Sequence, residues 1–120
     1  MSGTFRNPLT QRIAEFLRGI GVAVRMGAIP DATFLPGIHI EGGGLVVEEA
    51  RLAYPGDLLH EAGHLAVMTA ERRGSIAGFA GEDGGEEMAA IAWSWAAVTK
   101  MGCRRTWSFT RRVTGAVRAA

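Results

Sequence analysis

Residues 58–72 have the sequence LLHEAGHLAVMTAER, which predicts an apolar helix that carries His60, Glu61 and His64. A helix turns about 100° per residue, so side chains four residues apart lie on one face, roughly 6 Å from each other. His60 and His64 can therefore bind one metal ion from the same side. Glu61 projects roughly 100° away from His60, where it can hold a metal-bound water without being a ligand itself. The spacing thus predicts a zinc site with Glu61 as its general base.

The flanking residues favour a helix at this position. Tyr54-Pro55-Gly56 predicts a turn, Asp57 is a natural N-cap, and Gly74 is a natural C-cap. A histidine in an apolar helix is more often a hydrogen-bonded core residue than a ligand. Here the helix is apolar on most sides, and burying two unpaired histidines beside a glutamate would be costly. A bound metal ion is the interpretation that removes this cost.

Length and composition indicate one small domain. The chain has 120 residues, a formal net charge of +1 and one cysteine, Cys103, which excludes an intrachain disulfide framework. Residues 1–8 lack the apolar core of a signal sequence, and no apolar run is long enough to span a membrane. We expect a soluble cytoplasmic protein, with a single domain over residues 1–102 and a separate basic tail over residues 103–120.

The first half of the chain predicts a packing helix followed by short strands. Thr10 can cap a helix that continues to about Arg18, and glycines follow it. Extended runs at residues 33–35, 38–40 and 45–47 are separated by Pro-Gly and by a triple glycine, which is typical of a hairpin. The expected fold class is α+β, with a small antiparallel sheet packed on the helix that carries the histidines.

A second long helix is predicted over residues 86–101, EEMAAIAWSWAAVTKM, and ends at Gly102. Its two leading carboxylates, Glu86 and Glu87, are explained either by the helix dipole or by the need of zinc for a third protein ligand. Glu87 is the ligand that we favour, because it shares a helix face with a row of small and apolar residues: Ala90, Ile91, Ser94 and Val98. On this prediction Glu86 points outward.

Other candidate residues have simpler alternative roles. His39 is a possible donor near the metal or a solvent-facing strand residue, and Tyr54 is a possible oxyanion donor or a turn residue. Glu71 lies about 10 Å beyond His64 along the same helix, too far to share its metal. Cys103 and the pair Glu48-Glu49 remain reserve ligands, and surface charge is the simpler role of the two glutamates.

The chain resembles the zincin metallopeptidases, in particular the gluzincin arrangement in which HExxH is followed by a glutamate ligand on a later helix. HEAGH at 60–64 matches the motif, and EMAAIAWS at 87–94 is loosely similar to the ExxAxxFA segment of ImmA/IrrE-type peptidases. The resemblance covers about a third of the chain. It implies Zn²⁺ bound by His60, His64 and Glu87, with Glu61 as base. Ile91 stands where many gluzincins carry an acidic residue that orients a ligand histidine.

The expected function is that of a zinc-dependent metallopeptidase in a minimal zincin-like domain, with a peptide or protein as substrate. The alternative is a non-catalytic module that a closed metal site stabilises, with His39 or Cys103 as a fourth ligand. The tail at 103–120 carries five of the 13 basic residues and no acidic one, together with Trp107 and Phe109. Nucleic-acid binding through this tail is a third interpretation, and we rank a solvated tail or an added strand above it.

Overall fold

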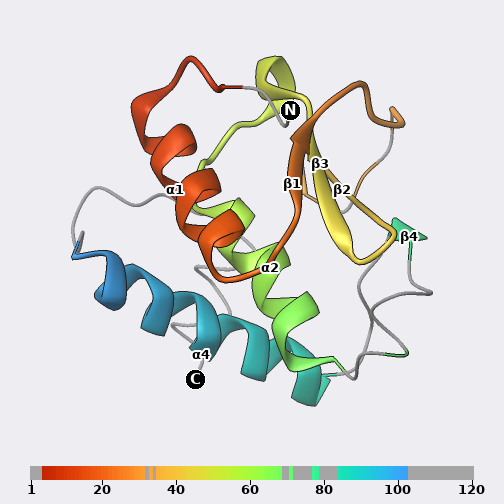
Figure 1. The fold of residues 1–120 in the computed structure, drawn as a ribbon. Coiled ribbons are helices and arrows are strands. Elements are labelled where there is room, and N and C mark those ends of the chain that lie inside the picture. The colour runs from red at the N-terminus through yellow and green to blue at the C-terminus, as the bar shows by residue number, and fades with distance from the viewer. Residues whose placement is uncertain are drawn as a thin grey trace.

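The chain folds around one central helix, as a computed structural model shows (Figure 1). The structure describes residues 4–31, 33, 35–68, 71, 77–78 and 84–102. The α+β class that the sequence predicts is confirmed. In chain order the elements are α1 (Pro8–Gly19), β1 (Val24–Met26), β2 (Ile38–Glu41), β3 (Gly44–Val47), the 3₁₀ turn η1 (Glu49–Arg51), α2 (Asp57–Val67), β4 (Ala77–Gly78) and α4 (Gly84–Met101).

The sheet is mixed, with the strand order β1-β3-β2-β4. Strands β2 and β3 form the predicted hairpin, whose turn consists of Gly42 and Gly43 at φ 59° and 80°. Strand β1 pairs with β3 in parallel, so the sheet is not wholly antiparallel. Of the run predicted at 33–35, the structure describes residues 33 and 35, and of these two only Leu35 pairs, through a single bridge to Ile38. Alternation of apolar residues predicts that a strand exists, whereas its direction depends on pairing partners distant in sequence.

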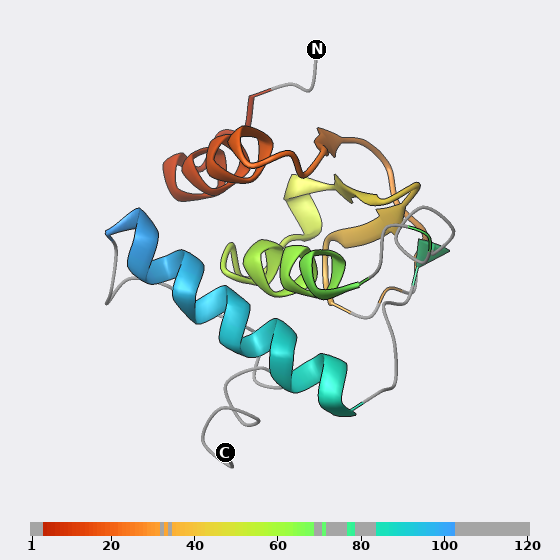
Figure 2. The same cartoon turned by 60° about the horizontal axis from the view of Figure 1, so that its bottom comes forward.

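Helix α2 lies between the sheet and α4 (Figure 2), and it belongs to the same buried core as both. The pattern of β2 alternates, with Ile38 and Ile40 buried in this core and His39 and Glu41 on the other face. Helix α1 covers one end of α2 and of the sheet. The residues of α2 that fill the core are Leu58, Leu59, Ala62 and Leu65.

The N-cap of α1 is Asn7, not Thr10 as predicted. The Asn7 side chain accepts hydrogen bonds from the backbone N–H groups of Leu9, at 2.8 Å, and Thr10, at 3.2 Å. Pro8 is the first helical residue, where its fixed φ suits a helix and its missing N–H costs nothing. Thr10 therefore lies one turn inside the helix, and it is buried.

Helix α2 starts without a side-chain cap, so the prediction that Asp57 caps it is wrong. Asp57 is the first helical residue and is fully buried. The preceding turn replaces the cap, because the carbonyls of Tyr54 and Pro55 accept from the N–H groups of Asp57, at 3.0 Å, and Leu58, at 3.1 Å. The helix ends at Val67, and Met68 is extended. The predicted C-cap, Gly74, lies outside the described residues.

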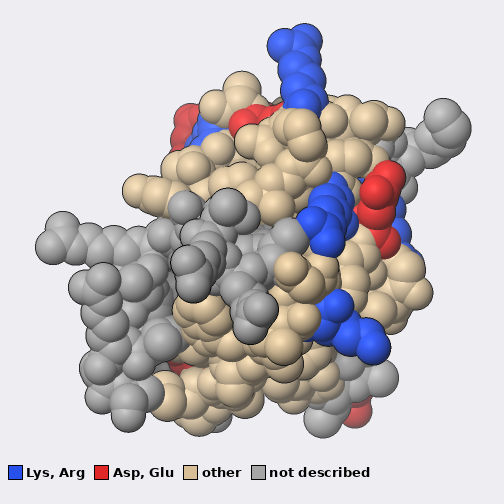
Figure 3. All heavy atoms as spheres, turned by 90° about the vertical axis from the view of Figure 1, so that its left-hand side faces the viewer, with Lys and Arg blue, Asp and Glu red and all other residues tan. Residues whose placement is uncertain are grey.

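Helix α4 matches its predicted range closely and ends before Gly102, which has φ 79°. No helix in the described part of the chain is long and apolar enough to cross a membrane. On the face that Figure 3 shows, the described Lys and Arg side chains stand apart from one another among uncharged residues, and a few acidic side chains lie near them. The tail at 103–120, and with it the predicted domain boundary, lies outside the described residues.

Candidate metal centre

A glycine in the HEAGH segment allows α4 to approach α2 closely. A Cβ atom on Gly63 would lie only 2.6 Å from the carbonyl oxygen of Ala90, closer than real Cβ contacts come. With hydrogen in that place, the backbone of α4 rests directly on α2. This contact brings the first turn of α4 beside the two histidines of α2.

The face of α4 that packs inward is the one that the sequence predicts. Ala90, Ile91, Ser94 and Val98 are all buried, with exposed fractions of 5% or less. Ser94 satisfies its hydroxyl within the helix by donating to the carbonyl of Ile91 at 2.7 Å. Because Glu87 begins this row, its side chain is directed toward α2.

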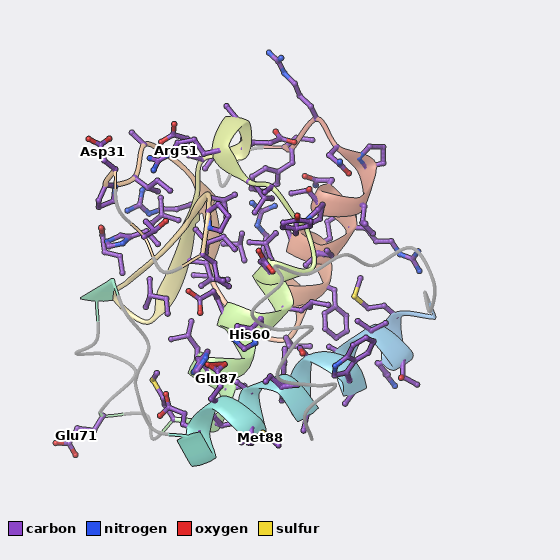
Figure 4. The ribbon with its side chains drawn as sticks, turned by 180° about the vertical axis from the view of Figure 1, so that it is seen from behind. Asp31, Arg51, His60, Glu71, Glu87 and Met88 are labelled. Atoms are coloured by element: carbon purple, nitrogen blue, oxygen red, sulfur yellow. The ribbon has the colours of Figure 1, made fainter. Side chains whose placement is uncertain are left out.

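Glu87 lies between the two histidines. Its Oε1 atom is 2.7 Å from Nε2 of His60 and 3.2 Å from Nε2 of His64. Figure 4 shows His60 on α2 and Glu87 on α4 directed toward one another. The His60 nitrogen is close to the carboxylate but not aligned for a hydrogen bond, whereas the His64 contact has hydrogen-bond geometry. One carboxylate oxygen thus meets Nε2 of both rings, whose planes are inclined at 88°.

Glu86 also points inward, so the prediction that it faces outward is wrong. Its Oε1 atom lies 3.2 Å from Nδ1 of His64, and its side chain is only 9% exposed. The reason is geometric, because α2 packs over the first turn of α4 and side chains on both sides of that turn can reach it. Glu87 therefore contacts both histidine rings, and Glu86 contacts the ring of His64 as well.

Glu61 is completely buried, and neither of its carboxylate oxygens has a hydrogen-bond partner among the described residues. Burial raises the pKa of Glu61 from 4.5 to about 8, and the negative charges of Asp57 and Glu87 contribute to the rise. Burial also lowers the pKa of His60 from 6.5 to about 4, although the charge of Glu87 opposes this change. Buried, unsatisfied polar atoms of this kind need a partner that the side chains do not supply.

A metal ion fits these requirements. His60, Glu61 and His64 each offer one donor atom, and these atoms lie within 4.8 Å of one another. Imidazole nitrogens and carboxylate oxygens are the donors that Zn²⁺ and related divalent ions bind. The three residues therefore form a buried group that could hold a metal ion.

The other sequence candidates lie away from this group. His39 is on the face of β2 opposite to the core, and its Nε2 atom is 4.0 Å from Oε2 of Glu41. Tyr54 is 40% exposed in the turn before α2. Glu71 is exposed and lies apart from His60 and Glu87 (Figure 4). Cys103 lies outside the described residues.

The two reserve glutamates hold backbone segments in place. Glu49 accepts from the N–H groups of Arg6, at 3.0 Å, and Asn7, at 2.9 Å, just before α1. Glu48 accepts from the N–H of Ile29 at 3.1 Å. These bonds tie η1 to two distant parts of the chain, a more definite role than the surface charge that the sequence indicated.

Comparison with known proteins found no relative of this chain. No protein-family model, no curated protein and no solved structure matches this chain. The inference of function therefore rests on the residues and geometry of the site.

Proposed function

We propose that this protein is a zinc-dependent metallopeptidase of the zincin type, with His60, His64 and Glu87 as metal ligands. The observation that carries the proposal is the convergence of Glu87 Oε1 on both Nε2 atoms, at 2.7 and 3.2 Å. Two imidazoles and one carboxylate from two helices form the ligand set of many catalytic zinc sites, which keep a fourth position for water. When bound, zinc supplies a water of lowered pKa and polarises the substrate carbonyl.

Glu61 is the residue that we assign as general base. It follows His60 directly in sequence, and its carboxylate is within 4.8 Å of the donor atoms of both histidines. No hydrogen bond from a described residue stabilises its negative charge, so Glu61 has a high affinity for a proton when no metal is bound. The positive charge of a bound zinc ion would favour the carboxylate form, which is the form that acts as a base. In the proposed reaction Glu61 would accept a proton from the attacking water and pass it to the leaving amine.

Elemental analysis tests the ligand set. We expect about one equivalent of zinc in the wild-type protein, retained in Glu61→Gln and lost in His60→Ala and Glu87→Ala. Cleavage of a mixed peptide library, followed by mass spectrometry, should be abolished in Glu61→Gln although the metal remains. A wild-type protein that binds no zinc even after zinc is added would overturn the proposal.

One observation favours the alternative of a metal-stabilised module without catalysis. Counted over the whole residue, the exposed fractions of His60, Glu61 and His64 are at most 1%, as in a closed structural site. The side chain of Glu87, however, is 30% exposed, which gives the proposed site one side open to solvent. Acetohydroxamate distinguishes the two functions, because it binds zinc only where a coordination position is open. We expect it to raise the melting temperature of the zinc-loaded protein, and no rise would favour the closed module.

A further inference from the structure

Each ring nitrogen of His64 faces a different glutamate. Glu86 Oε1 lies 3.2 Å from Nδ1, and Glu87 Oε1 lies 3.2 Å from Nε2. The His64 and Glu86 side chains are only 2% and 9% exposed. Consecutive residues at the start of α4 thus hold the ring from its two sides.

A neutral imidazole carries one N–H group, so only one of its two nitrogens can donate while the other keeps its lone pair. A metal takes the nitrogen with the lone pair, and the opposite N–H of a metal-ligating histidine usually donates to a carboxylate or carbonyl. Glu86 and Glu87 offer acceptors at equal distances from the two nitrogens. A metal bound at Nε2 would take the lone pair of that nitrogen, so the proton would lie on Nδ1, where Glu86 accepts it. Nε2 is also the nitrogen that points to Glu87 and the neighbouring His60.

His60 lacks a comparable partner. Its ring is 1% exposed, and its Nδ1 atom has no hydrogen-bond partner among the described residues. Ile91, one turn beyond Glu87 on the same face of α4, is buried and apolar. Among the described residues, the carboxylate that contacts the Nδ1 atom of a proposed ligand histidine is therefore that of Glu86, the residue just before Glu87.

We propose that Glu86 is a positioning residue: it accepts the Nδ1–H of His64 and thereby presents Nε2 of that ring to the metal. This inference rests on the proposed function, since it presumes a metal bound between α2 and α4. It assigns different tasks to the two acids of the sequence EE, with Glu87 as ligand and Glu86 as the residue that fixes a ligand. Removal of such an outer partner typically weakens metal binding by about 10- to 100-fold.

The test compares the full-length wild-type protein with Glu86→Ala, Glu86→Gln and the control Glu71→Ala, which removes an exposed carboxylate away from the site. Zinc affinity is measured by competition with a chelator of known affinity. Nitrogen NMR of histidine-labelled, metal-free protein reports which nitrogen of His64 carries the proton. We expect Glu86→Ala to weaken zinc binding by about 10-fold or more. In the metal-free protein it should shift His64 toward the Nε2–H form, because Glu87 remains as the acceptor at Nε2.

The conservative variant separates positioning from a general structural effect. The amide oxygen of Glu86→Gln can still accept the Nδ1–H, so the Nδ1–H form should persist and the zinc affinity should lie between those of wild type and Glu86→Ala. Wild-type affinity in both variants would overturn the role of Glu86 and leave the metal site intact. A wild-type protein that binds no zinc would instead overturn the proposed function, and the role of Glu86 with it.

Discussion

Glu61 and His60 are adjacent buried residues whose pKa values shift in opposite directions. In metal-free protein the pKa of Glu61 is about 8 when folded and 4.5 when unfolded, so between these values folding takes up a proton. The pKa of His60 is about 4 when folded and 6.5 when unfolded, so in that window folding releases one. Below pH 6.5 the two groups change the free energy of unfolding in opposite directions as pH rises. Above pH 6.5 the change comes from Glu61.

We therefore predict that the metal-free protein loses stability from pH 6.5 to pH 8. The folded state binds more protons there than the unfolded state, so the free energy of unfolding falls as pH rises. One proton corresponds to at most about 1.4 kcal/mol per pH unit, or about 2 kcal/mol over this range. Urea unfolding at several pH values measures the slope. Glu61→Gln should flatten it, and an unchanged slope in that variant would assign the effect to another group.

The residues of the site differ in how far sequence could predict them. His60, Glu61 and His64 follow from spacing within one helix, which local geometry determines. The inward direction of Glu87 follows from the periodicity of α4. The direction of Glu86 does not, because it depends on how α2 crosses the first turn of α4. The burial of Asp57 was missed for a similar reason, since an acidic residue at a helix start usually indicates a cap.

At the level of elements, the contact between α2 and α4 depends on Gly63. Glycine to alanine normally favours a helix by about 1 kcal/mol. At Gly63 the new Cβ would meet the Ala90 carbonyl oxygen at 2.6 Å, and overpacking of this kind costs about 1–3 kcal/mol. We predict that the net effect of Gly63→Ala is to lower the free energy of unfolding by up to about 2 kcal/mol, as urea unfolding would measure. It should also weaken zinc binding, because α4 and Glu87 are displaced from the histidines.

Gly19 provides the matched control. It ends α1, and a Cβ there would have no neighbour within 4 Å. Gly19→Ala should be neutral or stabilising by up to about 1 kcal/mol and should leave zinc affinity unchanged. Equal effects of the two substitutions would contradict a specific close approach at Gly63.

The start of α1 gives a separate prediction, because Asn7 bonds two N–H groups there. Asn7→Ala should lower the free energy of unfolding by about 1 kcal/mol, the usual value for a lost N-cap. Asn7→Asp retains the acceptor and should be close to wild type in the same urea titration. If Asn7→Asp instead lost as much stability as Asn7→Ala, the amide nitrogen of Asn7 and not its capping oxygen would be the group that stabilises the helix.

The elements that sequence predicted are those with a local signal. Helix α4 has a long apolar pattern and a glycine stop, and the β2–β3 hairpin has glycines in its turn. Strand β1 has three residues and pairs in parallel with β3, about 20 residues further along the chain. Nothing within Val24–Met26 indicates that pairing. The turn before α2 likewise replaced an expected side-chain cap with backbone carbonyls.

For the molecule as a whole, the proposed metal joins the two helices that share the core, so its removal should weaken the entire fold. An ion that binds only the folded state stabilises it by about 4 kcal/mol at a free concentration 1,000 times its Kd. For a chain of 120 residues this corresponds to a rise in melting temperature of roughly 10–20 °C.

Thermal unfolding of the full chain, with zinc and then with excess EDTA, measures this difference in melting temperature. Glu61→Gln should show at least as large a difference as wild type, because it keeps all three proposed ligands. His60→Ala and His64→Ala should show little or none, since each removes a proposed ligand nitrogen from α2. The zinc-free melting temperatures of all variants serve as the reference, which separates lost binding from lost packing. A full zinc-dependent rise in His60→Ala would place the metal elsewhere on the chain and would contradict a centre shared by α2 and α4.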